Sequence, residues 1–134
     1  MAIIDWYSRY VIAWHLSTTL EALFCIQALQ SALVETRCDI MNSDQGSQFT
    51  SKAWVNILLD SKIQISMDGR GRYLDNIFVE RLWRSAKQEC IYLNCFNRVA
   101  EVNRALNAYF DYYNNTRFHQ ALDYKTPAQI HLLK

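Results

Sequence analysis

The stretch SDQGSQFTS, residues 43–51, is polar apart from one phenylalanine and follows a short segment, residues 39–42, that is predicted to be a strand. Its second residue, Asp44, places a carboxylate where that strand ends. Gly46 follows two residues later and is expected to let the backbone turn sharply away. The sequence therefore predicts a carboxylate that projects from the edge of a sheet, a common position for functional groups.

The residues around this stretch predict further strands and helices. Short β-branched and aromatic runs at 2–6 and 10–16 indicate a hairpin of two strands, and leucines and isoleucines at helical spacing indicate a helix from about 19 to 35. Leu20, Leu23, Ile26, Leu29 and Leu33 carry this pattern. Thr50 or Ser51 caps a helix that carries Trp54, Ile57 and Leu58 inward, and Ile63 and Ile65 mark another strand.

The second half of the chain is predicted to be mainly helical. Residues 66–76 contain two of the three glycines and indicate a loop that ends at Asp75, a helix N-cap. Helices are predicted from there to about Tyr92 and from about 98 to 114. A last helix begins with a capping box at Thr126, which Pro127 and Gln129 complete. The order of elements predicts an α/β fold, a mixed sheet flanked by helices.

The composition is that of one folded domain. The chain has 134 residues, of which 51% are hydrophobic and 13% aromatic, and this excludes a disordered protein. No apolar run approaches the roughly 20 residues that span a bilayer, and the N-terminus lacks a signal-peptide pattern. The four cysteines form no CxxC pair and no zinc spacing, which predicts reduced thiols in the cytoplasm.

The net charge of +1 conceals an uneven distribution. Residues 69–87 hold five basic residues against only Asp75 and Glu80, and such a cluster suits a polyanionic partner beside an acidic site. The basic residues are Arg70, Arg72, Arg81, Arg84 and Lys87. A solvated helix face is the ordinary alternative.

Asp44 and Glu80 have 35 residues between them, but so do Asp39 and Asp75, and Asp75 and Asp111. Because about one such pair arises by chance at this acidic content, only the context can choose. Asp44 lies at a strand end, and Glu80 follows a glycine-rich loop, one turn into a helix. This context favours Asp44 and Glu80.

Glu80 is expected to share one helix face with two cations. At about 100° per residue, Arg84 lies about 40° and Lys87 about 20° from Glu80 around the helix axis. Phe78, Leu82 and Ala86 form a neighbouring, buried stripe. Ion pairs between residues one turn apart, worth a few tenths of a kcal/mol, are the structural alternative.

Four segments of the chain resemble the catalytic core of insertion-sequence transposases, specifically the second-frame transposase of the insertion-sequence-three family, and the related retroviral integrases. These segments are AIIDWYSRYVIAW (2–14), NSDQGSQFTS (42–51), ISMDGRGRYLDNIFVERLWRSAKQE (65–89) and YNNTRFHQALDYKTP (113–127). They cover nearly the whole chain, 1–134, and make 113–134 the C-terminal tail of the family's integrase-type core.

This resemblance implies an RNase H-like fold in which Asp44 and Glu80 are the second and third acids of a catalytic triad. Such triads bind Mg²⁺ or Mn²⁺, and oxygen ligands suit these hard cations. Two ions can activate an attacking water, which nicks DNA, or a DNA 3′-hydroxyl, which joins strands. The implied function is DNA transposition and integration in a bacterial cytoplasm, at the nucleoid.

The resemblance also assigns partners and supporting residues. Double-stranded DNA, both transposon ends and target, is the implied partner, with Arg84 and Lys87 on its phosphates and Arg70 and Arg72 in a loop near it. Asp75 and Asn76 match a structural cap before the catalytic helix.

The first acid of the triad has no match in these 134 residues. The family carries it in a Trp-x-x-Asp-x-Thr context on a central first strand, and this chain contains no such string. Asp5 instead matches a non-catalytic aspartate with Arg9 as partner. We therefore expect little or no activity from this chain alone, and a homo-oligomer that compensates for the missing strand.

Several smaller features also give expectations. Residues 34–42 lack the glycine and proline typical of the family, and Phe118 and Asp123 replace a proline and a glycine in the tail. His15 and His131 are predicted to be structural, and His119 is predicted to pack or cap, with a phosphate contact as the alternative. Core positions are predicted for Trp54, Trp83, Tyr109 and Phe110.

Two other functions remain open at this point. One is a non-catalytic remnant that binds DNA or associates with a full-length transposase. The other is a stand-alone RNase H-like nuclease acting on RNA–DNA hybrids or recombination junctions, against which the transposase-like segment 113–127 argues.

Overall fold

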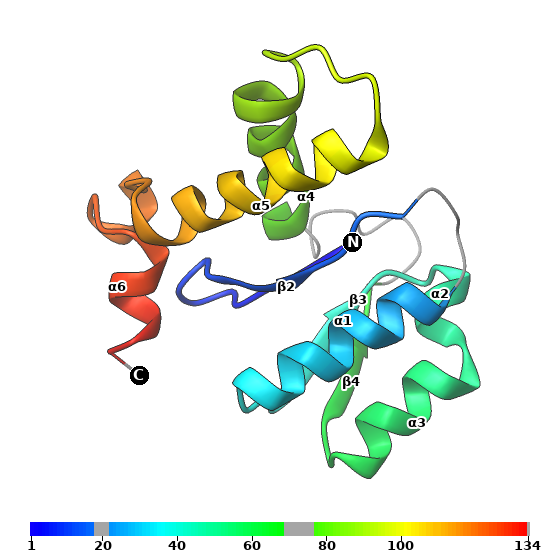
Figure 1. The fold of residues 1–134 in the computed structure, drawn as a ribbon. Helices are drawn as coiled ribbons and strands as arrows, with labels where there is room; N and C mark the ends of the chain where they lie inside the picture. The colour runs from blue at the N-terminus through cyan, green and yellow to red at the C-terminus, as the bar shows by residue number, and fades with distance from the viewer. Residues whose placement is uncertain (18–21, 69–76, 134) are drawn as a thin grey trace. The chain divides into compact units, whose positions relative to one another are not determined.

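The computed structural model describes residues 1–17, 22–68 and 77–133 (Figure 1). The chain divides into two compact units, and the hairpin contributes to both. The first unit comprises Met1–Ile3 and Ile12–Ile77, and the second comprises Ile4–Val11 and Phe78–Lys134.

The predicted N-terminal hairpin is confirmed. Strands β1 (Ala2–Ile4) and β2 (Val11–Trp14) form a two-stranded sheet. In the turn between them, Asp5 N donates to Tyr10 O at 2.9 Å and Arg9 N donates to Asp5 O at 2.8 Å. Arg9 has a φ of 64°, an uncommon conformation for a residue with a side chain, which closes the turn.

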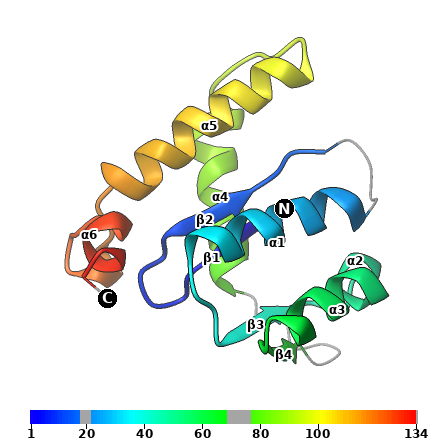
Figure 2. The same cartoon turned by 60° about the horizontal axis from the view of Figure 1, so that its bottom comes forward.

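The first unit combines helices with a parallel pair of strands (Figure 1, Figure 2). Its elements are α1 (Ala22–Glu35), β3 (Ile40–Ser43), α2 (Ser47–Thr50), α3 (Lys52–Asp60) and β4 (Gln64–Met67). Strand β3 pairs in parallel with β4, from Ile40 opposite Gln64 to Ser43 opposite Met67. The carboxyl ends of both strands therefore lie at one edge.

The buried face of α1 differs from the predicted leucine stripe. Leu29 is fully buried as expected, but Leu23 is 61% exposed. The face that packs on Trp54 and Leu58 of α3 consists instead of small residues around Leu29, which allow close packing. These small residues are Cys25, Ala28 and Ala32.

The helix after the opening stretch begins where the sequence predicted. Ser51 is the N-cap of α3, and its hydroxyl accepts a hydrogen bond from Trp54 N at 3.4 Å. Trp54 and Leu58 are 1% and 0% exposed, while Ile57 is only half-buried.

Among the described residues, the strands form two separate two-stranded sheets, β1–β2 and β3–β4. The class is therefore mixed α/β as expected, but these hydrogen bonds do not join all four strands into the single mixed sheet that we predicted. The RNase H-like sheet order, with a first central strand missing, stays a prediction.

Helices dominate the second unit. Helix α4 (Ile77–Ala86) continues into a π-helical turn, η2 (Lys87–Ile91), and α5 (Val99–Asn115) crosses it (Figure 1). A 3₁₀ turn, η3 (Gln120–Leu122), and α6 (Pro127–His131) complete the unit. As predicted, Leu82 and Ala86 are buried, and so are Tyr109 and Phe110.

The C-terminal part of the second unit is hydrogen-bonded to the hairpin turn. The buried Asn114 side chain accepts from Val11 N at 2.8 Å and donates to Val11 O at 3.0 Å. The His131 ring stacks on Tyr10 at 4.4 Å, and its Nδ1 lies 3.3 Å from the Ser8 hydroxyl. His131 therefore has the structural role that we expected.

The capping box of α6 is also confirmed. Gln129 N donates to Thr126 Oγ1 at 3.3 Å, and Thr126 N donates to Gln129 Oε1 at 2.8 Å. Just before it, Asp123 and Tyr124 both have a φ of 60°. Asp123 thus occupies the kind of backbone position at which glycine is preferred.

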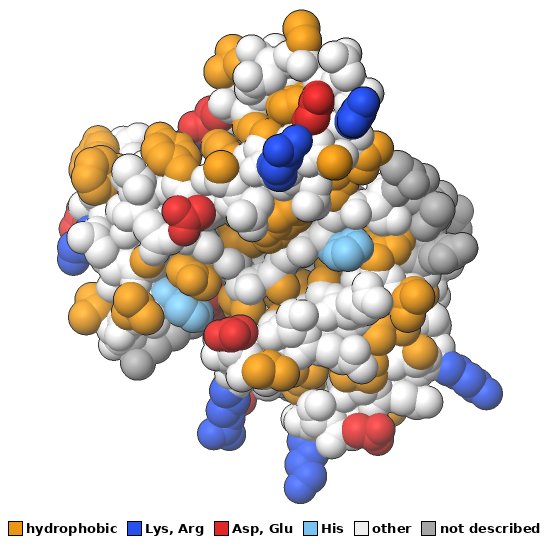
Figure 3. Space-filling model, in the orientation of Figure 1, with side chains coloured by type: hydrophobic (Ala, Val, Ile, Leu, Met, Phe, Trp, Pro, Cys, Tyr) orange, Lys and Arg blue, Asp and Glu red, His pale blue; other side chains and the backbone are white. Residues whose placement is uncertain are grey.

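Charged and apolar side chains are interspersed on the face displayed in Figure 3. Basic and acidic groups are scattered over this face and do not gather into one patch of a single sign. None of the helices in the described part of the chain has the length and apolar character required to cross a membrane.

Candidate functional site

Asp44 lies directly after β3, in the first unit, and is exposed. Its Oδ1 accepts a hydrogen bond from Gly46 N at 2.7 Å, a turn closed by the side chain. The strand end therefore presents this carboxylate to solvent, as the sequence predicted.

The reason for glycine at position 46 differs from our expectation. Gly46 has φ −59° and ψ 151°, a conformation open to any residue, so the turn does not need glycine for its backbone. Instead, a Cβ here would lie 2.8 Å from Asp44 Oδ1 and 2.9 Å from Gln48 Oε1. Glycine leaves room for the Asp44 carboxylate.

A second aspartate, Asp68, follows the neighbouring strand β4 and is 7% exposed. Its N–H donates to Ser43 O at 2.9 Å, and its carbonyl accepts from Gln45 Nε2 at 3.0 Å. These bonds tie the end of β4 to the loop that carries Asp44. Sequence reasoning did not single out Asp68, although the register of two adjacent strands could have suggested it.

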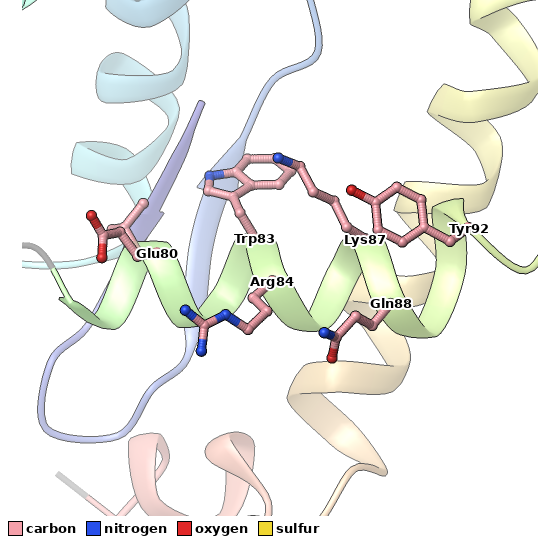
Figure 4. A pocket seen from close by; sticks show the side chains of 7 residues that line it. Glu80, Trp83, Arg84, Lys87, Gln88 and Tyr92 are labelled. Atoms are coloured by element: carbon pink, nitrogen blue, oxygen red, sulfur yellow. The ribbon is translucent and has the colours of Figure 1, made fainter.

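Glu80 lies in the first turn of α4, in the second unit, and Arg84 and Lys87 lie on the same face. All three are exposed. Within the described part of the chain, Glu80 forms no ion pair shorter than 4 Å, and its carboxylate and the Arg84 guanidinium point apart in Figure 4. The alternative of Glu80–Arg84 ion pairing one turn apart is therefore not supported.

A groove with a volume of about 480 Å³ runs along this face. Val79 and six residues labelled in Figure 4 line it: Glu80, Trp83, Arg84, Lys87, Gln88 and Tyr92. Trp83 was predicted to be a core residue, and its ring does contact Phe110 edge-on at 5.8 Å, but it is only half-buried. Its position one turn after Glu80 was the signal that could have placed it here.

The π-helical turn η2 is held by a cluster of polar side chains. Glu89 Oε2 accepts from the Tyr109 hydroxyl at 2.6 Å, and Glu89 Oε1 accepts from Arg117 Nε at 2.9 Å. Burial alone would raise the pKa of Glu89, but the hydrogen bonds from Arg117 and Tyr109 outweigh it and lower the pKa. Burial and the bond to Glu89 raise the pKa of Tyr109.

His119 packs within the same region. Its ring meets Tyr113 edge-on at 4.7 Å, and burial, followed by the charge of Arg117, lowers its pKa to about 4. The prediction that His119 packs, rather than binds phosphate, agrees with this environment. His15 likewise stacks on Phe24, at 5.7 Å.

A serine, a histidine and an aspartate lie together at the hairpin turn, but they have a structural role. They are Ser8, His131 and Asp5. Ser8 is 0% exposed; its hydroxyl donates to Asp5 Oδ2 and accepts from Tyr10 N at 3.2 Å. Because the Ser8 hydroxyl is buried and makes hydrogen bonds to Asp5 and Tyr10, it is not available as a nucleophile. The Arg9 guanidinium lies 3.8 Å from the centre of the Phe78 ring, and the Arg9 backbone N–H donates to Asp5 O at 2.8 Å.

Four predicted site residues, Arg70, Arg72, Asp75 and Asn76, lie outside the described residues. Asp44 and Glu80 belong to different units, so a site that they share stays a prediction. In residues 1–17, 22–68 and 77–133, no group of three or more His, Cys, Asp or Glu side chains forms a ready metal site. The exposed carboxylates of Asp44 and Glu80 are nevertheless the hard oxygen ligands that Mg²⁺ prefers.

Two family models, both described as integrase core domain, match the chain over residues 1–72 and 61–127. This chain belongs to the integrase core domain family. It is related to the transposase for insertion sequence element IS629 of Shigella sonnei, with 31% identity over 129 residues, 95% of this chain and 44% of that protein. The resemblance to insertion-sequence transposases of the retroviral-integrase superfamily, inferred from the four segments, is confirmed.

Solved structures at lower identity show a similar mixed α/β fold, that of an integrase catalytic core. The simian T-cell lymphotropic virus intasome in complex with the PP2A regulatory subunit B56 gamma gives a TM-score of 0.79 at 19% identity, over 97% of this integrase core and 46% of that chain. The HTLV-2 integrase catalytic core domain in complex with magnesium (dimeric form) gives a TM-score of 0.61 at 21% identity, over 96% of this chain and 80% of that chain. This chain spans 44% of the length of the IS629 transposase, and 32% and 51% of the lengths of two further curated relatives.

Proposed function

We propose that this chain is the metal- and DNA-binding core of an insertion-sequence transposase that cuts and joins DNA strands. The observation that carries the proposal is the exposed face of α4, where Glu80 stands beside Arg84 and Lys87 without an ion pair to either. A carboxylate and two cations held apart in this way suit a metal ion and DNA phosphates bound side by side.

Asp44 and Glu80 would hold Mg²⁺ or Mn²⁺ as the second and third acids of the family's triad. The metal would polarise a phosphate and activate water or a DNA 3′-hydroxyl. Asp44 is prepared for this role because Gly46 N–H fixes one carboxylate oxygen and leaves the group exposed. Arg84 and Lys87 would position the DNA backbone, a task that carries no sequence information.

Metal binding can be tested on this chain directly by NMR. Mn²⁺ added to ¹⁵N-labelled protein should broaden the amide signals of Gly46 and Glu80 together, because a paramagnetic ion affects every nucleus near it. The Asp44→Asn variant should lose both effects. A matched control, Asp60→Asn, changes another exposed aspartate of the first unit and should lose neither.

If Asp44→Asn leaves the broadening at Glu80 unchanged, the two acids do not share an ion and the assigned site is wrong. If neither amide broadens but the protein binds duplex DNA, the chain is the non-catalytic DNA-binding form that the sequence left open.

We expect this chain alone to nick supercoiled DNA weakly or not at all, because its sequence offers no Trp-x-x-Asp-x-Thr aspartate. Strong Mn²⁺-dependent nicking that survives Asp44→Asn would contradict the proposed chemistry. We also propose a homo-oligomer: HTLV-2 integrase cores occur in dimeric and trimeric forms. A monomer at all concentrations in analytical ultracentrifugation would contradict this.

A further inference from the structure

The groove on α4 and η2 contains aromatic groups that metal and phosphate binding do not require. Trp83 and Tyr92 stand on either side of Lys87 in Figure 4, and Tyr92 is 70% exposed. All residues that line the groove belong to the second unit. The groove therefore has an aromatic part as well as a charged part.

The π-helical turn explains why Tyr92 reaches this groove. On a regular α-helix, Tyr92 would lie about 120° from Glu80 around the axis, on a different face. In η2, Tyr92 N donates instead to the carbonyl five residues earlier, Lys87 O, at 2.8 Å. The extra residue in this turn rotates Tyr92 back by about 100°, to within about 40° of Lys87.

The turn is anchored from outside the helix. Glu89, in the middle of η2, is bound by the Tyr109 hydroxyl and by the Arg117 guanidinium. Trp83 is fixed too, because its ring packs edge-on against Phe110. Two aromatic side chains are thus positioned beside the cations by contacts with α5 and the tail.

Together these groups match the chemistry of a nucleotide. A base stacks on aromatic faces whatever its sequence, while phosphates pair with Arg and Lys. A volume of about 480 Å³ lies in the range of small-molecule sites. A base inside a duplex has no free face, so only an unpaired base could use Trp83 and Tyr92.

We propose that this groove binds an unpaired nucleobase of the DNA, stacked on Trp83 and Tyr92, with the adjoining phosphate on Lys87 or Arg84. The inference rests on the proposed function, since it specifies the form of DNA that the site takes. Glu89, Tyr109 and Arg117 are positioning residues for Tyr92.

The test uses 2-aminopurine, a base whose fluorescence falls when it stacks. A single-stranded tetranucleotide and a duplex with a one-base 3′ overhang each carry this probe at the unpaired position. We expect the native chain to quench both and to bind the overhang duplex about tenfold more tightly than the same blunt duplex. A native chain that quenches neither probe overturns the inference.

Variants separate stacking from general DNA binding. Trp83→Leu keeps an apolar contact for Phe110, and Tyr92→Ala removes an exposed ring; each should lower the tenfold preference to about one without changing blunt-duplex affinity. Tyr124→Ala removes a ring that is 66% exposed elsewhere in the same unit and should keep the preference. Glu89→Gln should also reduce the preference for the overhang duplex, because it weakens the contacts that position Tyr92 while both aromatic rings are still present.

The outcomes distinguish this inference from the proposed function. If Trp83→Leu and Tyr92→Ala keep the overhang preference, the base site is wrong even though Mn²⁺ and duplex binding stand. If Lys87→Ala weakens blunt and overhang duplexes equally while Trp83→Leu weakens only the overhang, both the phosphate contact and the base site are supported.

Discussion

The end of β3 and the α4–η2 face each carry one candidate acid, but they hold it in different ways. Asp44 is fixed by a hydrogen bond from a residue two positions away, Gly46. The face that carries Glu80 continues into a turn held by a contact that spans 28 residues, because Arg117 anchors Glu89 there. One region is thus built by local sequence and the other by tertiary contacts, so they should respond differently to mutation.

The largest effect should follow from breaking a tertiary contact between α5 and the hairpin, in the same unit as the α4–η2 face. Asn114→Ala removes both side-chain bonds to Val11 and leaves a buried N–H and carbonyl without partners, at a cost of about 2–3 kcal/mol in unfolding free energy. Urea denaturation would measure it. The control Asn115→Ala removes an exposed amide bound to Asp111 and should cost under about 1 kcal/mol; equal losses would show that the Val11 contact is unimportant.

The pH dependence of stability in the second unit, which contains the α4–η2 face, should come next in size. The pKa of His119 is lowered from 6.5 to about 4, so the unfolded chain binds the proton more readily and stability falls as pH drops through this range. With an allowance for partial exposure, the loss is about 2 kcal/mol. Glu89, whose pKa is also lowered, adds a loss at lower pH. His119→Gln should flatten the dependence of the unfolding free energy on pH between pH 6.5 and 4. If the slope is unchanged, the loss of stability at low pH does not come from His119.

The local region should show a smaller and more confined effect. Gly46→Ala places a Cβ against Asp44 Oδ1 and Gln48 Oε1, both ends of movable side chains, so we expect a loss of about 1 kcal/mol. Amide chemical shifts should change at Asp44 and its neighbours only, and Mn²⁺ should broaden the amide signal of position 46 less than in the native chain. Ser47→Ala, one residue along, is the control and should leave the Asp44 turn intact.

The smallest effect should be a gain. Asp123→Gly relieves a φ of 60° in the tail and should stabilise the second unit by about 0.5–1 kcal/mol, whereas Asp123→Ala should destabilise it. Thermal unfolding of the native chain, Asp123→Gly and Asp123→Ala would rank their stabilities. If the alanine variant is as stable as the glycine variant, backbone conformation does not govern this position.

The same contrast explains what the sequence could predict. The caps at Ser51 and Thr126 were found because a cap and its partner lie three residues apart, within one readable motif. The exposed Asp44 turn was found for the same reason. Spacing alone could not select Asp44 and Glu80, but their local context favoured this pair. The resemblance then supplied the family and the roles of the two acids, which stay a prediction.

The groove was missed because its causes are distant or leave no pattern. Nothing in KQECI marks a π-helical turn, and without that turn Tyr92 belongs on another face. The bond between Glu89 and Arg117 joins residues that no periodicity connects. The buried stripe of α1 was misplaced for another reason: cysteine and alanine give weaker hydrophobic signals than the exposed Leu23, although their small size suits the contact with α3.

The divided second unit also bears on how the chain folds during synthesis. The turn segment Ile4–Val11 leaves the ribosome before Asn114, which lies 103 residues after its partner Val11. The first unit can collapse before α5 has been synthesised, while the hairpin turn still lacks its partner. This unit includes helices α1 and α3 and strands β3 and β4. Contacts across such a long separation are slow to form, and until Asn114 arrives the backbone of Val11 is left open to pairing with other nascent chains.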